Sequence, residues 1–185
     1  AVPFGEDECV QMGAGSQLVC SFSHHTAAAR ATSAEFLVNA NESLAEASAF
    51  FREASTIIIT LGTAWTFRFN ATGEIVSNCL KRDAKEFTRE RLSLKTCSVL
   101  LNSLVGKYPQ KRFIFTVSPI RHLKDGAHGN QISKSTLLMA VESVVENHPD
   151  QCAYFPAYEI MMDELRDYRF YAEDMVHPSQ QAVNY

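Results

Sequence analysis

Hydrophobic and polar residues recur with the period of a helix along parts of this chain. Apolar positions over residues 33–53 return every three or four residues, as on the buried face of an amphipathic helix. Residues 32–35 are Thr-Ser-Ala-Glu, a capping box in which hydroxyl and carboxylate each bond the other residue's backbone N–H group. Similar spacing predicts a second helix near residues 93–107 and a third over about residues 133–147.

Short apolar runs lie between these helices and predict strands. Residues 56–61 are apolar and β-branched without alternation, as in a strand covered on both faces, and residues 112–117 and 153–155 are similar. Because strands and helices alternate with connections long enough for crossovers, we predict an α/β fold with three layers and a mainly parallel sheet. We expect residues 1–185 to form a single domain of this kind.

Several segments fall outside this alternation. Residues 64–69 and 74–78 flank a short Asn-Ala-Thr-Gly turn and predict a hairpin. Residues 1–31 are expected to be irregular, and residues 81–91 to form a polar loop. A further loop is expected over residues 121–130, where two glycines mark turns before the third helix.

The composition argues against several classes of function. The net charge is −4 with no run of Lys or Arg, which argues against nucleic-acid binding and against a membrane anchor. No stretch approaches the roughly 18 apolar residues of a transmembrane helix. The first residues lack the basic and apolar parts of a signal peptide, so a cytoplasmic protein is the simplest interpretation, although a signal removed upstream would leave the same sequence. Five scattered cysteines without a Cys-x-x-Cys pair predict neither a disulfide framework nor a zinc site, and no cofactor is expected.

Two candidate catalytic residues lie near the end of the chain, where Asp174 precedes His177 by three residues. A carboxylate so placed can accept a hydrogen bond from one ring nitrogen and leave the other nitrogen free as a base. We therefore predict a hydrogen bond between Asp174 and the Nδ1 of His177. Pro178 suits the first position of a helix, so the pair is expected on a loop just before a terminal helix.

The predicted topology brings other residues to the same edge. In parallel α/β sheets the active cleft lies beyond the carboxyl ends of the strands. The loops after the three predicted strands begin at Gly62, Ser118 and Pro156, and the last of these runs on to the Asp-x-x-His pair. Arg121 and His122, on the second loop, either contact substrate or anchor the loop to backbone carbonyls, and the sequence leaves both interpretations open.

Three blocks of the sequence, residues 60–65, 117–126 and 154–179, resemble the GSCFA family, a bacterial group with SGNH/GDSL-hydrolase-like architecture. Residues 21–25 and 130–134 also fit, so the resemblance covers nearly the whole chain. It implies a three-layer, flavodoxin-like α/β fold of the SGNH-hydrolase type, incomplete here at both ends. It further implies a serine-esterase type of site, without specifying the substrate.

Under this resemblance, Asp174 and His177 match the Asp-x-x-His of SGNH hydrolases as orienting acid and general base. Gly62 matches the glycine of a Gly-x-Asn-Asp block that helps to build the oxyanion hole. The next positions depart from that block, because Ala64 stands where an Asn would donate and Trp65 where an Asp would be.

The substrate-binding candidates complete this set. Asn78, on the predicted hairpin, is a substitute for the missing oxyanion donor. Trp65 is expected in the core or as a wall of the cleft, and His25 lies in the matching block near the N-terminus. Loss of one oxyanion donor can cost about two to three powers of ten in rate, so the departure at Ala64 matters.

The nucleophile is the largest departure. The family is named after a Gly-Ser-Cys-Phe-Ala motif, and this pentapeptide does not occur here. By the match, residue 1 already lies downstream of it, so we expect the nucleophile upstream of Ala1 and regard the chain as a fragment that also lacks most of its terminal helix after Tyr185. Ser16, in the only Gly-Ser pair of the chain, follows no predicted strand and is a weak candidate.

The same match gives a structural expectation for residues 56–61. In the SGNH arrangement the nucleophile-bearing strand lies beside this one, and nothing in its sequence blunts an exposed edge. We therefore expect an interior strand whose open side is filled by residues upstream of Ala1, by part of segment 1–25, or by another copy of the chain through self-association.

Three functions remain open at this stage. The first is hydrolysis or transfer of an O-acyl group, with acetyl the expected acyl group, on a small-molecule or carbohydrate ester through an acyl-serine. The second is a non-catalytic relative that binds a glycan or a partner in the same cleft. The third is a metal site, although the spacings of known sites are missing; its ligands would come from His24, His25, His122, His128 and Asp174.

Overall fold

The computed structural model describes all 185 residues and divides them into two compact units. The first unit contains Ala1–Ala54 and Trp65–Glu90, and the second contains Ser55–Ala64 and Arg91–Tyr185. The prediction of a single domain over residues 1–185 concerns the two units together and stays a prediction.

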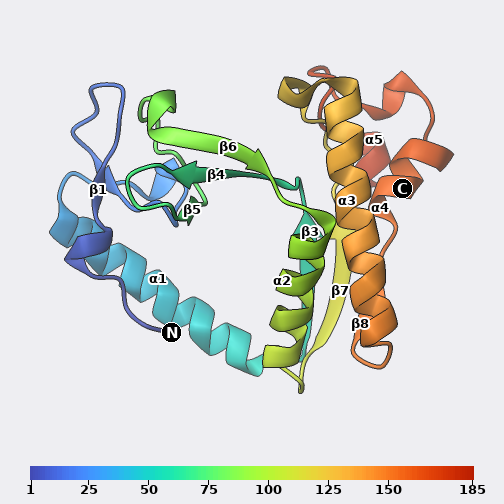
Figure 1. Ribbon diagram of the computed structural model, residues 1–185, viewed down its shortest axis with the longest axis horizontal. Helices are drawn as coiled ribbons and strands as arrows, with labels where there is room; N and C mark the ends of the chain where they lie inside the picture. The colour runs from blue at the N-terminus through green and yellow to red at the C-terminus, as the bar shows by residue number, and fades with distance from the viewer. The chain divides into compact units, whose positions relative to one another are not determined.

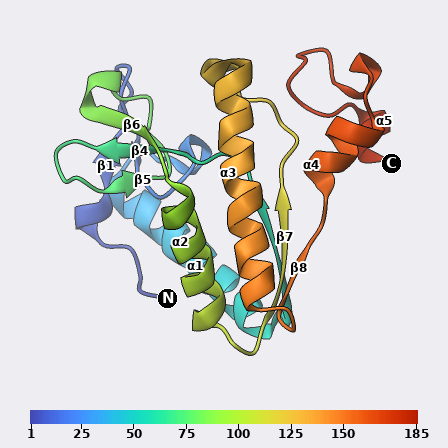
Figure 2. The same cartoon turned by 45° about the vertical axis from the view of Figure 1, so that its right-hand side comes forward.

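A three-stranded parallel sheet organises the second unit (Figure 1). Its order is β3 (Thr56–Leu61), β7 (Arg112–Val117) and β8 (Cys152–Tyr154), so the middle strand comes from the middle of the chain. Both pairs of neighbours are parallel. With helices α2 (Leu94–Lys107) and α3 (Gly126–Asn147) packed against the sheet, the unit is an α/β structure consistent with the predicted three-layer fold (Figure 2).

The core of this unit lies between β7 and the two long helices. Alternate residues of a strand face the same side, and in β7 the residues Phe113, Phe115 and Val117 are buried on the side of the helices. They pack against apolar residues at helical spacing on α2 and α3: Cys97, Leu101, Val105, Leu137, Ala140, Val141 and Val144. Burying one Phe stabilises the fold by about 1.5–3 kcal/mol, so this layer supplies much of the stability of the unit.

Within this chain β3 is not covered on both faces, and the interior position expected for it stays a prediction. β3 pairs only with β7, so it is an edge strand. Its burial alternates, with Ile57 and Ile59 packed on the core while Ile58 is 69% exposed. β1 (Val10–Gln11) and β2 (Val19–Cys20) pair with each other, and the sheet that contains β3 has no strand from segment 1–25.

The long helix of the first unit confirms the first predicted pattern. α1 spans Ser33–Glu53, and the Thr32 side chain accepts a hydrogen bond from the backbone N–H of Glu35, which is half of the predicted capping box. Residues 1–31 are less irregular than expected, because β1 and β2 form a short antiparallel pair within them. A small core joins the helix to this segment and comprises Met12, Cys20, Phe36, Ala40 and Leu80.

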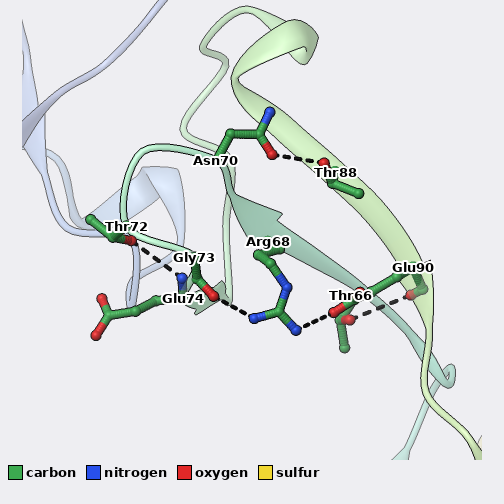
Figure 3. Close-up of polar contacts among 8 residues, drawn as sticks. All are labelled: Thr66, Arg68, Asn70, Thr72, Gly73, Glu74, Thr88 and Glu90. Atoms are coloured by element: carbon green, nitrogen blue, oxygen red, sulfur yellow. Dashed lines mark hydrogen bonds and ion pairs between the residues drawn. The ribbon is translucent and has the colours of Figure 1, made fainter.

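The predicted hairpin is present as β4 (Trp65–Phe69) and β5 (Ile75–Val76). A third strand, β6 (Phe87–Arg91), joins β4 on its other side and was missed, because its polar sequence suggested a loop. Figure 3 shows the polar groups that stabilise it: Arg68 bonds both the Gly73 carbonyl and the Glu90 carboxylate.

The third predicted helix starts earlier than expected. α3 begins at Gly126, so Gly129 lies inside the helix instead of marking a turn. Gly126 itself makes the turn into the helix with a φ of +68°, a left-handed value that glycine adopts without strain. The early start places Ser133, where the helix was expected to begin, in the helix interior.

The last part of the chain is built of short elements. After β8 come a helical turn, α4 (Ala157–Glu159), and a π-helical turn over Ile160–Glu164. A 3-10 turn at Tyr168–Phe170 and a final helix, α5 (Gln180–Val183), bracket the loop that carries the Asp-x-x-His pair. All five cysteines are free thiols, and none of the helices has the length and hydropathy to span a membrane.

Candidate active site

Asp174 and His177 form the predicted hydrogen bond. The Nδ1 of His177 donates to the Oδ2 of Asp174 over 2.6 Å. The pair lies on the loop just before α5, which Ser179 caps by accepting the N–H of Ala182. The His177 side chain is 57% exposed and its Nε2 makes no hydrogen bond within the chain, so this nitrogen can act as a base towards a bound molecule.

The backbone of the loop fixes the carboxylate of Asp174. Its Oδ1 accepts the N–H groups of His177 (3.0 Å) and Val176 (2.9 Å). The backbone N–H of His177, then its imidazole and the N–H of Val176, lower the pKa of Asp174 to about 2. The carboxylate is therefore ionised at neutral pH and keeps the proton of His177 on Nδ1.

The fold closes this loop at its base. Tyr171 and Pro178 form an antiparallel bridge, and the N–H of Ala172 bonds the carbonyl of His177 over 2.8 Å. The tight turn inside requires a left-handed backbone at Met175, whose φ is +59°. A non-glycine residue in this conformation stores strain, a feature that clusters at functional sites.

Arg121, on the segment after β7, bonds the same loop and anchors it. Its Nη1 donates to the carbonyl of Met175 and its backbone N–H to the carbonyl of Val176, both over 3.2 Å. The guanidinium also lies 5.2 Å from the centre of the Tyr171 ring. Of the two interpretations that the sequence left open for Arg121, these contacts are those of a loop anchor.

His122, the next residue, bonds the turn that follows β3. Its Nε2 lies 3.2 Å from the carbonyl oxygen of Gly62, so Nε2 carries the proton and donates it. Its backbone N–H donates to the Oδ1 of Asn130 over 3.0 Å. Loops that follow β3, β7 and β8 are thus connected through Arg121 and His122, which agrees with the predicted convergence of these loops at one edge.

Lys134 and Ser133 also hold the Gly62 turn, and the sequence analysis gave neither a role in the site. The Nζ of Lys134 donates to the carbonyl of Gly62 over 2.6 Å, and the Ser133 hydroxyl accepts the N–H of Ala64 over 2.8 Å. One pattern could have identified Lys134: it lies three residues before Leu137 and seven before Val141, on the buried face of α3.

Three other sequence candidates belong to the first unit and make local contacts there. The side-chain Oδ1 of Asn78 accepts the N–H of Leu80 over 2.8 Å, in a turn where Leu80 has a φ of +52°. The Nδ1 of His25 accepts the N–H of Ala27 and caps a short 3-10 turn. The Ser16 hydroxyl accepts the N–H of Leu18 in the turn between β1 and β2. These bonds account for the conformation of each side chain and leave their proposed roles as predictions.

Trp65 and Ala64 are the two positions expected to depart from a Gly-x-Asn-Asp block, and both make contacts within their own units. Trp65 begins β4, and the guanidinium of Arg89 stacks 4.1 Å from the centre of its ring. Ala64 is buried, and its N–H bonds Ser133. Ala64 therefore offers neither a side-chain donor nor a free backbone donor.

The residues named for a metal site do not form a metal-binding group. His24 bonds the hydroxyl of Ser21 over 2.6 Å and His122 bonds Gly62, while His128 lies exposed on α3. The structure contains no group of three or more His, Cys, Asp or Glu side chains that could hold a metal ion.

Fold and site together define a class: an α/β protein with a parallel sheet whose loops carry an Asp-x-x-His pair with an exposed imidazole. The chain belongs to the GSCFA family, whose model matches residues 4–185. Comparisons with curated proteins and with solved structures gave no match.

Proposed function

We propose that the protein is a serine-type hydrolase or transferase of O-acyl groups, with acetyl the favoured acyl group. The observation that carries the proposal is the 2.6 Å hydrogen bond between Asp174 and the Nδ1 of His177, with the Nε2 exposed. An ionised carboxylate behind an imidazole is the arrangement that activates a serine hydroxyl in acyl transfer. The substrate class is a small-molecule or carbohydrate ester.

The proposed chemistry has two half-reactions. The Nε2 of His177 takes the proton of a serine hydroxyl as the oxygen attacks the ester carbonyl, and Asp174 stabilises the resulting imidazolium. Collapse of the tetrahedral intermediate expels the alcohol, which receives that proton, and leaves an acyl-serine. Water or a second hydroxyl then attacks the acyl-serine with His177 again as base. The nucleophile is not assigned among the described residues, and we expect it upstream of Ala1.

Gly62 is the proposed oxyanion donor. The carbonyl of Leu61 accepts the N–H of Ser118. The N–H of Gly62 belongs to the same trans peptide group and points opposite to that carbonyl, so it points away from β7. It makes no hydrogen bond within the chain. A Cβ built on Gly62 would meet only the Nε2 of His122, at 4.0 Å, so the position is open to a ligand.

The direct test measures turnover of a small acetyl ester by the full-length protein and its His177→Ala variant. Loss of the base is expected to lower kcat by several powers of ten, while the exposed imidazole contributes little to folding. His128→Ala is the matched control, because His128 is also exposed in the second unit and lies outside the site. Turnover by His177→Ala equal to that of the unchanged protein would rule out the assignment.

A second candidate function is ligand binding without catalysis. The observation that favours it is Ala64, which replaces a donor Asn and whose N–H is already bonded to Ser133. A protein of this kind would bind a glycan or a partner in the cleft, and the full-length form would show no ester turnover. Turnover that depends on His177 excludes it.

A further inference from the structure

A single buried ammonium joins the carboxyl ends of two neighbouring strands. The Lys134 side chain on α3 is 0% exposed. Its Nζ donates to the carbonyl of Gly62, the first residue after β3, and to the carbonyl of Ser118, the first residue after β7, each over 2.6 Å. Lys134 thus links the two strand ends where the loops of the candidate active site begin.

Stability alone does not explain this buried charge. Burial lowers the pKa of Lys134 to about 8, and no carboxylate compensates the charge. A well-packed apolar side chain of similar volume is often neutral or stabilising in place of a buried charge. The ammonium remains mostly protonated at neutral pH, so it keeps its donors to the two carbonyls.

The contacts of α3 determine how the Gly62 turn is oriented. Lys134 holds the carbonyl of Gly62, and the hydroxyl of Ser133 holds the N–H of Ala64 and lies 3.1 Å from the hydroxyl of Thr63. Adjacent residues of one rigid helix therefore fix both ends of a three-residue turn. The N–H of Ser118 holds the carbonyl of Leu61 and Lys134 holds the carbonyl of Gly62, so the peptide groups on both sides of Gly62 are fixed and its N–H stays directed away from β7.

We infer that Lys134 is a positioning residue for oxyanion binding, acting through Gly62. By holding the carbonyl of Gly62, Lys134 fixes the peptide group that follows the donor and so limits rotation at Gly62, which keeps its N–H facing the oxygen on which negative charge develops. Its positive charge, 2.6 Å from the carbonyl oxygen of Gly62, also has the sign that favours an oxyanion. This role rests on the proposed acyl-transfer function.

The first experiment compares Lys134→Met with Lys111→Met in the full-length protein. Lys111 is a matched control because it is also buried and directly precedes β7, at the opposite end of the strand from Ser118. Misplacing a catalytic donor by about 1 Å can cost on the order of 100-fold. We expect Lys134→Met to lower kcat by about 10- to 100-fold with KM little changed, and Lys111→Met to leave kcat near that of the unchanged protein. Equal kcat in the two variants overturns the inference.

Chemical rescue distinguishes the loss of the hydrogen bonds that Lys134 donates from the loss of its packing. In Lys134→Ala, n-propylammonium can fill the space and donate hydrogen bonds, whereas tetramethylammonium carries the same charge without a donor. Saturable recovery of kcat with n-propylammonium alone supports the inference. No recovery, or equal recovery with both cations, counts against it.

Nuclear magnetic resonance distinguishes failure of the inference from failure of the proposed function. If Lys134 orients the turn, Lys134→Met shifts the amide resonance of Gly62 strongly and Lys111→Met does not. An unchanged Gly62 amide in Lys134→Met overturns the inference even if the protein hydrolyses esters. Absence of ester turnover by the unchanged protein instead overturns the proposed function, and the shift of the amide still decides whether Lys134 orients Gly62.

Discussion

Arg121 and His122 are adjacent in the sequence, yet they bond two different loops of the candidate active site. Arg121 donates to the carbonyls of Met175 and Val176, on the loop of Asp174 and His177, while His122 donates to the carbonyl of Gly62. The segment after β7 therefore connects the proposed base to the proposed oxyanion donor. A change in this segment is expected to affect both.

The carboxylate of Asp174 is expected to control which nitrogen of His177 carries a proton. In Asp174→Asn the amide oxygen can still accept the N–H groups of Val176 and His177, but an NH2 group then faces the Nδ1. The neutral imidazole would move its proton to Nε2 and lose its function as a base. We expect kcat for an acetyl ester to fall by about three to four powers of ten, as in Ser-His-Asp enzymes with the same change.

Nitrogen-15 spectra of the imidazole would report the tautomer change directly. The control is Asp167→Asn, which alters another exposed carboxylate of the second unit that also accepts a backbone N–H group. A variant at Asp174 that keeps full activity would contradict the proposed role of the pair.

Arg121 is expected to affect activity through the order of the Asp-x-x-His loop. Arg121→Gln removes the guanidinium that bonds the carbonyl of Met175 and lies beside Tyr171. The backbone bond to Val176 remains, so we expect a fall in kcat of only about tenfold. Faster amide hydrogen exchange over residues 172–178 would accompany it. Reduced activity with unchanged exchange in that loop would show that Arg121 acts in another way.

Local patterns in the sequence predicted local structure well. The capping Thr32, the β4–β5 hairpin and the bond between Asp174 and His177 each join residues close in sequence, and all three are present. The periodic apolar residues of α1 and α2 fixed those helices to within about a residue.

Features that depend on distant partners were missed. Strand β6 is stabilised by cross-strand polar pairs such as Arg68 with Glu90, and its own residues give no apolar pattern. Lys134 meets Gly62 across 72 positions of sequence, so only its place on a buried helix face could suggest a role. The exposed side of β3 depends on which strand lies next to it, and no periodicity encodes that.

The buried charge of Lys134 predicts a specific dependence of stability on pH. Its pKa in the folded protein is about 8, below the usual value of 10.5, so between these values the unfolded state binds more protons. The free energy of unfolding therefore rises with pH across this window. Relative to Lys134→Met, the unchanged protein should gain on the order of 3 kcal/mol between pH 8 and pH 10.5. Urea denaturation at several pH values measures this difference, and parallel curves for the two proteins would contradict it.

The open edge of β3 is expected to be covered in the full-length protein. Bonds from the N–H of Arg112 to the carbonyl of Ser55 and from the N–H of Ser118 to the carbonyl of Leu61 mark the two ends of its ladder with β7. Peptide groups alternate along a strand, so the N–H groups of Ile58 and Thr60 point away from β7, where no strand of this chain pairs.

Such an edge is costly when bare, because unpaired N–H and C=O groups beside the exposed Ile58 would recruit other chains. We predict that a strand from residues upstream of Ala1, or from another copy of the chain, bonds this edge.

Amide hydrogen exchange of the full-length protein tests this prediction. The N–H groups of Ile58 and Thr60 should be protected as strongly as those of Ile57 and Ile59, which face β7 and serve as internal references. Protection that weakens on dilution, together with dissociation seen by sedimentation, would identify a second copy, whereas protection independent of concentration would identify an upstream strand. Rapid exchange of Ile58 and Thr60 would show that the edge is bare and would contradict the strand order expected for the fold.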